Sequence, residues 1–383
     1  MRVIIAPDSF KESLPAPEVA SALARGWLVG RPDDEVLCIP MSDGGEGTAD
    51  AMVSAMNGRF VLERVSNPLG EPIDATYGLF ARETKAVVEM ASASGLPLVP
   101  LERRNPGLTT TYGTGELIRA ALERGVTEII VAIGGSATND GGVGMAQALG
   151  YRFLDAHGQE LPPGGLAIER LERIDISAAH SALQRCHIRI ACDVNNPLCG
   201  PHGASSVYGP QKGATPDLVE RLDSALARLA VIVARDLGIS IAELPGSGAA
   251  GGLGGGLVAF AGGIMEPGVA VVADACELSE RMRGAGLVIT GEGRIDGQSV
   301  HGKTPVGVAR IARGLGIPAI GIAGALGSGF EAVHSEGLIA TFSIASGPGS
   351  LEQALAHTER RLVECAAALS RYWSLGADRG SPN

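Results

Sequence analysis

Residues 1–29 have the sequence MRVIIAPDSFKESLPAPEVASALARGWLV, in which a short apolar run precedes a polar loop and an amphipathic segment. Val3 to Ile5 predict a buried strand, because the run is rich in β-branched residues and a proline follows it closely. Residues 17–29 predict a helix, since apolar residues recur there at helical spacing. A strand, a loop and a helix in succession are typical of an α/β layer.

The same alternation continues outward from this stretch and returns near the end of the chain. Strands are predicted at 36–39, 287–290 and 319–323, and helices at 48–56, 305–314 and 351–371. Such alternation predicts a mostly parallel sheet covered by helices.

The middle of the chain has a different pattern. Residues 61–65 and 75–80 predict two strands joined by a turn-rich segment, which favours antiparallel pairing. Further strands are predicted at 87–90, 129–133, 188–191 and 269–273, and a long amphipathic helix at 216–237. We therefore expect two α/β domains, one inserted into the other. The expected ranges are 1–60 and 286–372 for the first domain, 61–285 for the inserted domain and 373–383 for a C-terminal tail.

Composition excludes some classes of function. The 383 residues carry a formal net charge of -11 and no Lys/Arg cluster, which argues against a nucleic-acid partner. The 55 glycines gather in short motifs, which favours loops that bring the backbone close to a ligand. The longest uncharged stretch, 245–265, is too rich in glycine for a membrane-spanning helix.

The six cysteines are scattered without any C-x-x-C pair, which is typical of reduced thiols in the cytoplasm. Cys192, Cys199 and His202 have a spacing that metal ligands also show, but no fourth ligand accompanies them. The N-terminal apolar run is too short for a signal peptide. We expect a cytoplasmic protein, and the sequence does not predict an oligomeric state.

Polar side chains follow the first two predicted strands, where open α/β sheets bind ligands. After the first strand, Asp8 is suited to a metal, Ser9 to a phosphate and Lys11 to the charge of a phosphoryl group. After the second strand, Asp43 and Glu46 lie among glycines, and either is suited to magnesium or to a general base. Helix capping or a tight turn would explain the same residues without a ligand.

A third loop, GGSATNDGG at 134–142, lies between a predicted strand and a predicted helix. Its glycines, hydroxyls and amide predict a phosphate cradle for a nucleotide. The expected nucleotide-binding residues are Gly134, Gly135, Ser136, Thr138, Asn139, Asp140 and Gly141.

Two further loops carry charged residues at strand ends. Asp193, in CDVNNPL at 192–198, is a candidate metal ligand or proton acceptor, and Lys212 follows in YGPQKG; an Asx-turn would explain the asparagines alone. The segment 290–305 contains Glu292, Arg294, Asp296 and Lys303. Residues 297–304 match G-x-x-x-x-G-K-[ST], but a strand that ends near Thr290 is too distant for a P-loop. Lys303 is still placed to meet a phosphate at a helix start.

The sequence also matches a motif of a different class of enzyme. Gly246 to Gly251 match G-x-G-x-x-G, and Asp274 follows the predicted strand at 269–273. That combination predicts a dinucleotide site and an NAD-dependent hydroxy-acid dehydrogenase. The segment before Gly246 ends in Pro245 and is a poor strand, which favours a glycine-rich packing turn. A third alternative is a non-catalytic regulator that binds a small molecule, but carboxylates in so many glycine loops argue against it.

The motifs in this order resemble the bacterial glycerate kinase family whose known members form 2-phosphoglycerate. The resemblance spans nearly the whole chain through APDSFKES, MSDGGEGT, GGSATNDGG, CDVNNPL with YGPQKG, PGSGAAGGLG and ITGEGRIDGQSVHGKTP. It implies a flavodoxin-like (Rossmann-like) domain interrupted by a second α/β domain. It also implies ATP-dependent phosphorylation of D-glycerate by direct in-line transfer, in glyoxylate or sugar-acid metabolism.

With that activity in view, we expect the following roles. Phosphoryl transfer depends mainly on positioning and on neutralising charge, with Mg²⁺ beside ATP. The expected catalytic residues are Asp193 as proton acceptor, Lys11 and Asp43. The expected substrate-binding residues are Asp8, Ser9, Glu46, Arg294 and Lys303, and the expected metal ligands are Asp193, Glu292 and Asp296.

Overall fold

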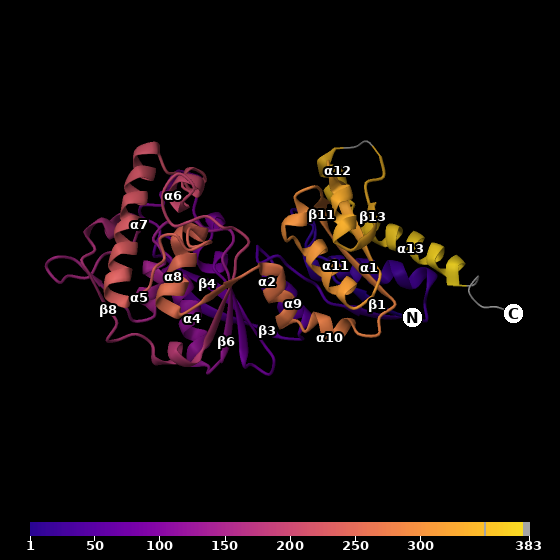
Figure 1. The fold of residues 1–383 in the computed structure, drawn as a ribbon, viewed down its shortest axis with the longest axis horizontal. Coiled ribbons are helices and arrows are strands. Elements are labelled where there is room, and N and C mark those ends of the chain that lie inside the picture. The colour runs from indigo at the N-terminus through magenta and orange to yellow at the C-terminus, as the bar shows by residue number, and fades with distance from the viewer. Residues whose placement is uncertain (348–349, 378–383) are drawn as a thin grey trace. The chain divides into compact units, whose positions relative to one another are not determined.

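The computed structural model describes residues 1–347 and 350–377, and the chain divides into two compact units. Unit 1 consists of Met1–Asp43, Asp50–Asn57 and the chain from Val269 onward. Unit 2 consists of Gly44–Ala49 and Gly58–Gly268. The colours of Figure 1 show both ends of the chain in unit 1 and the middle of the chain in unit 2.

Unit 1 contains a five-stranded parallel sheet. Its spatial order is β13 (Leu338–Ser343), β12 (Ala319–Leu326), β11 (Leu287–Ile295), β1 (Arg2–Ile5) and β2 (Glu35–Cys38). Numbered along the chain within this unit, the order is 2-1-3-4-5, the flavodoxin-like order, so the expected fold class is confirmed. Val3, Ile4 and Ile5 are fully buried, which explains their uninterrupted apolar run.

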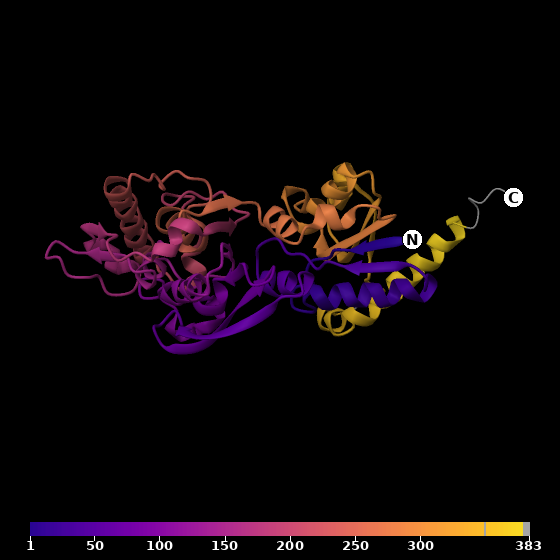
Figure 2. The same cartoon turned by 90° about the horizontal axis from the view of Figure 1, so that it is seen from below.

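Helices cover both faces of this sheet (Figures 1 and 2). α1 (Ala16–Gly30) and α13 (Thr358–Ala377) pack together, and α11 (Thr304–Gly314) packs on β11 and β12. Gly26 permits the first contact, because a Cβ there would lie 2.4 Å from the carbonyl oxygen of Val363. The other helices of this unit are α10 (Leu278–Met282), α12 (Leu351–Ala356) and most of α2 (Thr48–Ala55) and α9 (Gly268–Ala275).

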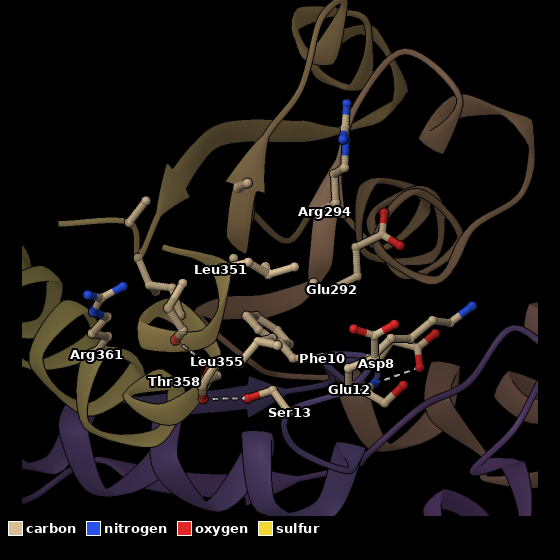
Figure 3. A pocket seen from close by; sticks show the side chains of 18 of the residues that line it. Asp8, Phe10, Glu12, Ser13, Glu292, Arg294, Leu351, Leu355, Thr358 and Arg361 are labelled. Atoms are coloured by element: carbon tan, nitrogen blue, oxygen red, sulfur yellow. Dashed lines mark hydrogen bonds between the residues drawn. The ribbon is translucent and has the colours of Figure 1, made fainter. Parts of the chain in front are cut away.

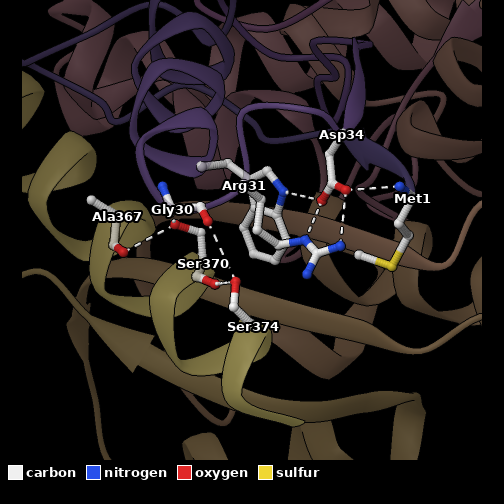
Figure 4. A network of polar contacts seen from close by, with 8 residues as sticks. Met1, Gly30, Arg31, Asp34, Ala367, Ser370 and Ser374 are labelled. Carbon is white, nitrogen blue, oxygen red and sulfur yellow. Dashed lines mark hydrogen bonds and ion pairs between the residues drawn. The ribbon is translucent and has the colours of Figure 1, made fainter. Parts of the chain in front are cut away.

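A polar network ties the N-terminus to the end of α1 (Figure 4). The carboxylate of Asp34 accepts from the N-terminal ammonium at 2.7 Å, from Arg31 Nε at 2.6 Å and from Trp27 Nε1 at 3.0 Å. Burial alone would raise the pKa of Asp34, but these hydrogen bonds outweigh it and hold the pKa at about 2.

Unit 2 contains a mixed six-stranded sheet. Its order is β10 (Ile264–Glu266), β9 (His187–Ala191), β6 (Glu128–Ala132), β5 (Lys85–Glu89), β4 (Pro72–Phe80) and β3 (Arg59–Ser66). The antiparallel pairing predicted for the β3–β4 hairpin is confirmed, while β5, β6, β9 and β10 run parallel. A separate antiparallel pair joins β7 (Arg152–Leu154) and β8 (Arg173–Asp175).

The longest helix of unit 2 is α7 (Pro216–Leu237), whose bounds match the prediction. Thr215 caps its N-terminus by accepting from Leu218 N at 3.3 Å, and Gly238 ends it with φ 72°. The other helices are α3 (Ala91–Ser94), α4 (Tyr112–Glu123), α5 (Val143–Ala148), α6 (Ala204–Tyr208) and α8 (Leu253–Ala261).

The structure corrects three expectations about the elements. Residues 269–273 are not a strand but part of α9, because tertiary packing outweighs the β-preference of the valines: Val269 packs on Gly307 and no strand pairs with the segment. β11 continues to Ile295 instead of ending near Thr290, since it pairs with β12 along that length. α13 continues to Ala377, so residues 373–377 are helical and not a tail, and 378–383 lie outside the described residues.

The units differ from the expected domain ranges at two boundaries. Residues 44–49 and 58–60 belong to unit 2, whereas the expected ranges gave residues 1–60 to the first domain. α9 from Val269 onward and α10 belong to unit 1, whereas the expected ranges gave residues up to 285 to the inserted domain. Among residues 1–347 and 350–377, no helix is long and apolar enough to span a membrane.

Candidate active site

The strand order of unit 1 reverses between β1 and β11, which is where doubly wound sheets bind ligands. Asp8 follows β1 and Glu292 lies on β11. Their backbones are neighbours, because Asp8 N donates to the carbonyl oxygen of Gly291 at 2.8 Å. A cavity of about 730 Å³ opens at this point, and its lining comes from unit 1 alone.

The cavity has a charged part and an apolar part (Figure 3). The charged lining residues are Asp8, Lys11, Glu12, Asp43, Glu292, Arg294 and Lys303, with Arg361 on the other side of the apolar part. The apolar ones include Phe10, Ile344, Leu351, Ala354 and Leu355. Ser9 also lines the cavity, so six predicted site residues besides Glu292 meet here: Asp8, Ser9, Lys11, Asp43, Arg294 and Lys303.

Asp8 is buried, with 8% of its surface exposed. Its carboxylate accepts from Ser9 N at 2.6 Å and from the hydroxyl of Thr304, the first residue of α11. Burial, followed by the charge of Asp43, raises the pKa of Asp8 to about 6, although these hydrogen bonds partly offset the rise.

Glu292 lies in a similar environment. It accepts from Ser299 Oγ at 2.8 Å, and Lys303 Nζ lies 3.8 Å from its other oxygen. Burial raises the pKa of Glu292 to about 7; Lys303 and Ser299 oppose the rise, and the charges of Asp8 and Asp43 add to it. Asp8, Asp43 and Glu292 thus share one poorly solvated environment, in which a bound cation would stabilise the charged form of the carboxylates.

These carboxylates fit magnesium in the way that phosphate-transfer sites bind it. Among the described residues, no group of three or more His, Cys, Asp or Glu side chains is placed to hold a metal by itself. Mg²⁺ usually takes one or two carboxylates and completes its shell with water and substrate phosphates. Asp8, Asp43 and Glu292 could supply those carboxylates.

Two other predicted site residues of this region have local partners. Asp296 accepts from Arg294 Nε at 3.1 Å and from Gln298 N at 3.0 Å, so it organises the turn after β11. Arg294 is exposed beyond Glu292, on the same strand.

The G-x-x-x-x-G-K-[ST] segment is not an open phosphate loop. The strand ends two residues before Gly297, so the expected separation from the strand was wrong. The loop amides are nevertheless occupied, because Gly297 N donates to Ser328 O, Gln298 N to Asp296 and Ser299 N to Asp296 O. A P-loop needs such amides free for phosphate oxygens.

Glu46 lies in the unit 2 segment that follows Asp43, and it is exposed. Glu89, and not Glu46, places its carboxylate at the start of α2. Its Oε1 accepts from Ala49 N at 2.6 Å. Sequence reasoning missed Glu89, since it lies far away in the chain at the end of β5.

Most of the predicted phosphate cradle is interior. Thr138, Asn139 and Asp140 of unit 2 are fully or almost fully buried, with at most 1% of their surface exposed. Asp140 accepts from the backbone N–H groups of Thr111, Gly142 and Gly144, so its carboxylate occupies the start of α5 that an anion would need. Burial raises the pKa of Asp140, against the effect of these hydrogen bonds.

Lys212 stabilises this loop from the protein interior. The side chain is buried, and its Nζ donates to Ser136 Oγ at 2.6 Å and to Thr138 O at 2.7 Å. Burial lowers the pKa of Lys212 to about 7, although the charge of Asp140 opposes the shift. Only Gly134 and Gly135 of the predicted cradle reach the surface.

Asp193 is exposed at the end of β9, and it accepts from Gly268 N at 2.9 Å at the start of α9. The neighbouring G-x-G-x-x-G segment serves close packing. A Cβ on Gly248 would lie 2.1 Å from Pro197 O, and one on Gly251 would lie 1.9 Å from Thr138 O. No strand leads into this segment, and Asp274 lies on a helix, so the dinucleotide-site pattern lacks its structural context.

Comparison with known proteins shows the family of this chain. The sequence model described as the Glycerate kinase family matches residues 3–374. The chain belongs to the glycerate kinase family. Within it, a relative named glycerate kinase from Bacillus subtilis (strain 168) is 48% identical over 373 residues, which cover 96% of this chain and 98% of the relative.

Other relatives extend the comparison. A protein named glycerate 2-kinase from Escherichia coli (strain K12) is 48% identical over 354 residues, covering 92% of this chain and 93% of its own. A crystal structure described as glycerate kinase 2 from Salmonella typhimurium LT2 superposes with a TM-score of 0.91 at 50% identity, covering 99% of both chains. The glycerate kinase family therefore accounts for the whole fold.

Proposed function

We propose that this chain transfers the γ-phosphoryl group of ATP to the 2-hydroxyl of D-glycerate, giving 2-phospho-D-glycerate and ADP. The observation that carries the proposal is the cluster of Asp8, Asp43 and Glu292 with Lys303 in the cavity of unit 1. The family supports it, since a relative at 48% identity is named glycerate 2-kinase.

The chemistry matches the needs of phosphoryl transfer. The bond from the γ-phosphorus to the ADP oxygen breaks while the bond to the glycerate oxygen forms in line, and the hydroxyl proton passes to a base. Lys11 and Lys303 line the cavity and would neutralise the transferring oxygens. Asp8, Asp43 and Glu292 would hold Mg²⁺, which shields the charge of the phosphates when it is bound.

The remaining assignments keep the roles expected from the sequence. Ser9 and Arg294 line the same cavity and would bind the glycerate hydroxyl and carboxylate. Asp193 is the proposed proton acceptor, supported by the exposure of its carboxylate at a strand end. Glu46 is retained as a substrate contact, and Gly134 and Gly135 as phosphate contacts, because these residues are accessible. Free thiols at all six cysteines support a cytoplasmic location, and organic-acid phosphorylation supports a place in glyoxylate metabolism.

A ³¹P NMR time course with purified protein, Mg-ATP and D-glycerate tests the proposal. We expect a new phosphomonoester signal, coupled to one carbon-bound proton and growing together with ADP. Coupling to two such protons would move phosphorylation to the 3-position. The absence of any signal that depends on glycerate, together with reduction of NAD by glycerate, would instead support a dehydrogenase.

A further inference from the structure

The cavity of unit 1 is far larger than glycerate needs. Its volume of about 730 Å³ falls in the range of ~300–1,000 Å³ that is typical of sites for drug-sized ligands. A three-carbon acid would leave most of that space, including the whole apolar part, unfilled. The cavity therefore has room for a second, larger ligand.

The apolar part has one wall from α12 and another from the loop after β1. Leu351 and Leu355 are four residues apart on α12, so they lie on one face of the helix, with Phe10 nearby in the cavity (Figure 3). Leu351 is 70% exposed although it lines the cavity. Leu351 is therefore apolar surface that a flat aromatic group would cover favourably, whereas Phe10 is buried and adds little accessible surface.

The two parts of the cavity are joined by a direct contact. Ser13 Oγ, from the loop that carries Asp8 and Lys11, donates to the carbonyl oxygen of Leu355 at 3.1 Å. Charged and apolar lining therefore belong to one continuous wall. Arg361 lies at the far margin (Figure 3), and its buried Nε has no hydrogen-bond partner in the described part of the chain.

We infer that the apolar part of this cavity, formed by Phe10, Leu351, Ala354 and Leu355, binds the purine base of the nucleotide. A nucleotide has the same distribution of polarity as the cavity, with a flat base at one end and charged phosphates at the other. The phosphates then extend toward Lys11 and Lys303. The inference rests on the proposed kinase function and assigns the nucleotide base to unit 1.

The interior packing of unit 2 supports this assignment. Asp140 fills the start of α5, and Lys212 is engaged with Ser136 and Thr138. Of the predicted cradle residues, Gly134 and Gly135 alone reach the surface, and Asp140 and Lys212 leave the rest of that loop no free interior space or donors for a base.

A matched pair of substitutions on α12 tests the inference. Ala354→Trp places a large ring in the apolar part of the cavity, whereas Ala356→Trp places the same ring on the same helix at an exposed position that does not line the cavity. Isothermal titration calorimetry would measure the affinity of the full-length protein for Mg-ADP and for Mg-pyrophosphate, which carries phosphates without a base.

We expect Ala354→Trp to weaken ADP binding by about tenfold, since the new ring takes the space of the base and the loss of an aromatic contact costs up to about that factor. Pyrophosphate affinity should stay within about twofold in both variants, and Ala356→Trp should bind ADP as wild type does. Leu351→Ser, which removes exposed apolar surface without filling space, should weaken ADP binding by about threefold or more.

Two results would overturn the inference: unchanged ADP affinity in Ala354→Trp, or an equal loss in Ala354→Trp and Ala356→Trp. If wild type still phosphorylates glycerate in either case, the kinase proposal stands and only the base site is wrong. If wild type binds ADP through Ala354 but transfers no phosphoryl group to glycerate, the base site stands and the proposed function fails.

Discussion

Two loops of this molecule, one in each unit, look alike in sequence and differ in structure. The loop after β1 in unit 1 and the loop after β6 in unit 2 both combine glycines or small residues with hydroxyls and a carboxylate at the end of a parallel strand. In unit 1 the carboxylate of Asp8 lines a cavity, and its pKa is raised toward neutrality. In unit 2 the carboxylate of Asp140 is buried among backbone N–H groups that it satisfies.

The difference lies in where the hydrogen-bond donors are used. Around Asp140 the donors come from the protein itself, at Thr111, Gly142 and Gly144, so the loop has no capacity left there for an anion. Asp8 and Glu292 also accept hydrogen bonds from the protein, but with Asp43 and Lys303 they line a cavity that a ligand can enter. Loop composition thus predicts a position at a strand end, but it does not predict whether the polar groups are already paired.

The largest expected effect is on activity in unit 1. Glu292→Gln removes one of the negative charges that would hold magnesium while it keeps the side-chain shape, and we expect turnover to fall by about a hundredfold or more. Steady-state release of ADP with D-glycerate measures it. The exposed Asp33→Asn carries the same charge change in unit 1 and should stay within about twofold. Near-normal turnover in Glu292→Gln would remove the main distinction between the two loops.

The second prediction concerns stability in unit 2. Asp140→Asn should lower the free energy of unfolding by about 2–4 kcal/mol, because an amide cannot accept from all the donors that surround the buried carboxylate. Urea denaturation measures this loss, and the exposed Glu220→Gln should change stability by less than about 0.5 kcal/mol. A weakened affinity for ATP at unchanged stability would show instead that the loop is a ligand site.

The third prediction concerns a substitution in unit 1 that should lower stability without changing activity. The pKa of Asp34 is about 2, below its unfolded value of about 3.9, so its stabilising effect is present above pH 4 and is lost as pH falls toward 2. The contribution is about 2 kcal/mol at neutral pH. Asp34→Asn should lose it at pH 7 and should reduce the decline in stability between pH 4 and 2, with kcat unchanged at a temperature where the variant is folded. Equal acid sensitivity in variant and wild type would contradict this role.

The smallest expected effect is on the pH dependence of stability, and it concerns Lys212. Its folded pKa of about 7 is lower than the unfolded value of about 10.4, so the unfolded chain binds more protons above pH 7. Stability should therefore rise by about 1 kcal/mol from pH 6 to pH 8 in wild type relative to Lys212→Met. Urea titrations of both proteins at the two pH values measure the difference. A constant difference would mean that Lys212 stays charged through its contacts with Ser136 and Thr138.

Much of the fold could be predicted from local pattern. β1, α1, α7 and the β3–β4 hairpin follow from periodicity, caps and turns, because these features depend on residues close together in the chain. The strand predicted at 269–273 was wrong for the opposite reason. Its valines favour a strand locally, but they lie in a helix in which Val269 packs against Gly307, a residue that lies far along the chain.

Some residues of the candidate site could likewise be recognised in the sequence, and others could not. Asp8, Lys11 and Lys303 could be recognised in the sequence, since each lies beside a strand end or a helix start. Glu89 and the apolar wall of α12 could not, because nothing near them in the chain indicates a ligand.

The alternation of strands and helices, the resemblance to glycerate kinases and the loops that carry polar residues all follow from the order of the amino acids. Which loop lines a cavity and which is closed by its own hydrogen bonds follows only from the folded chain. The physical reason is that burial and hydrogen-bond pairing depend on partners distant in sequence: Thr111 and Lys212 close the loop of unit 2, while Leu351 and Leu355 from the last part of the chain extend the cavity of unit 1.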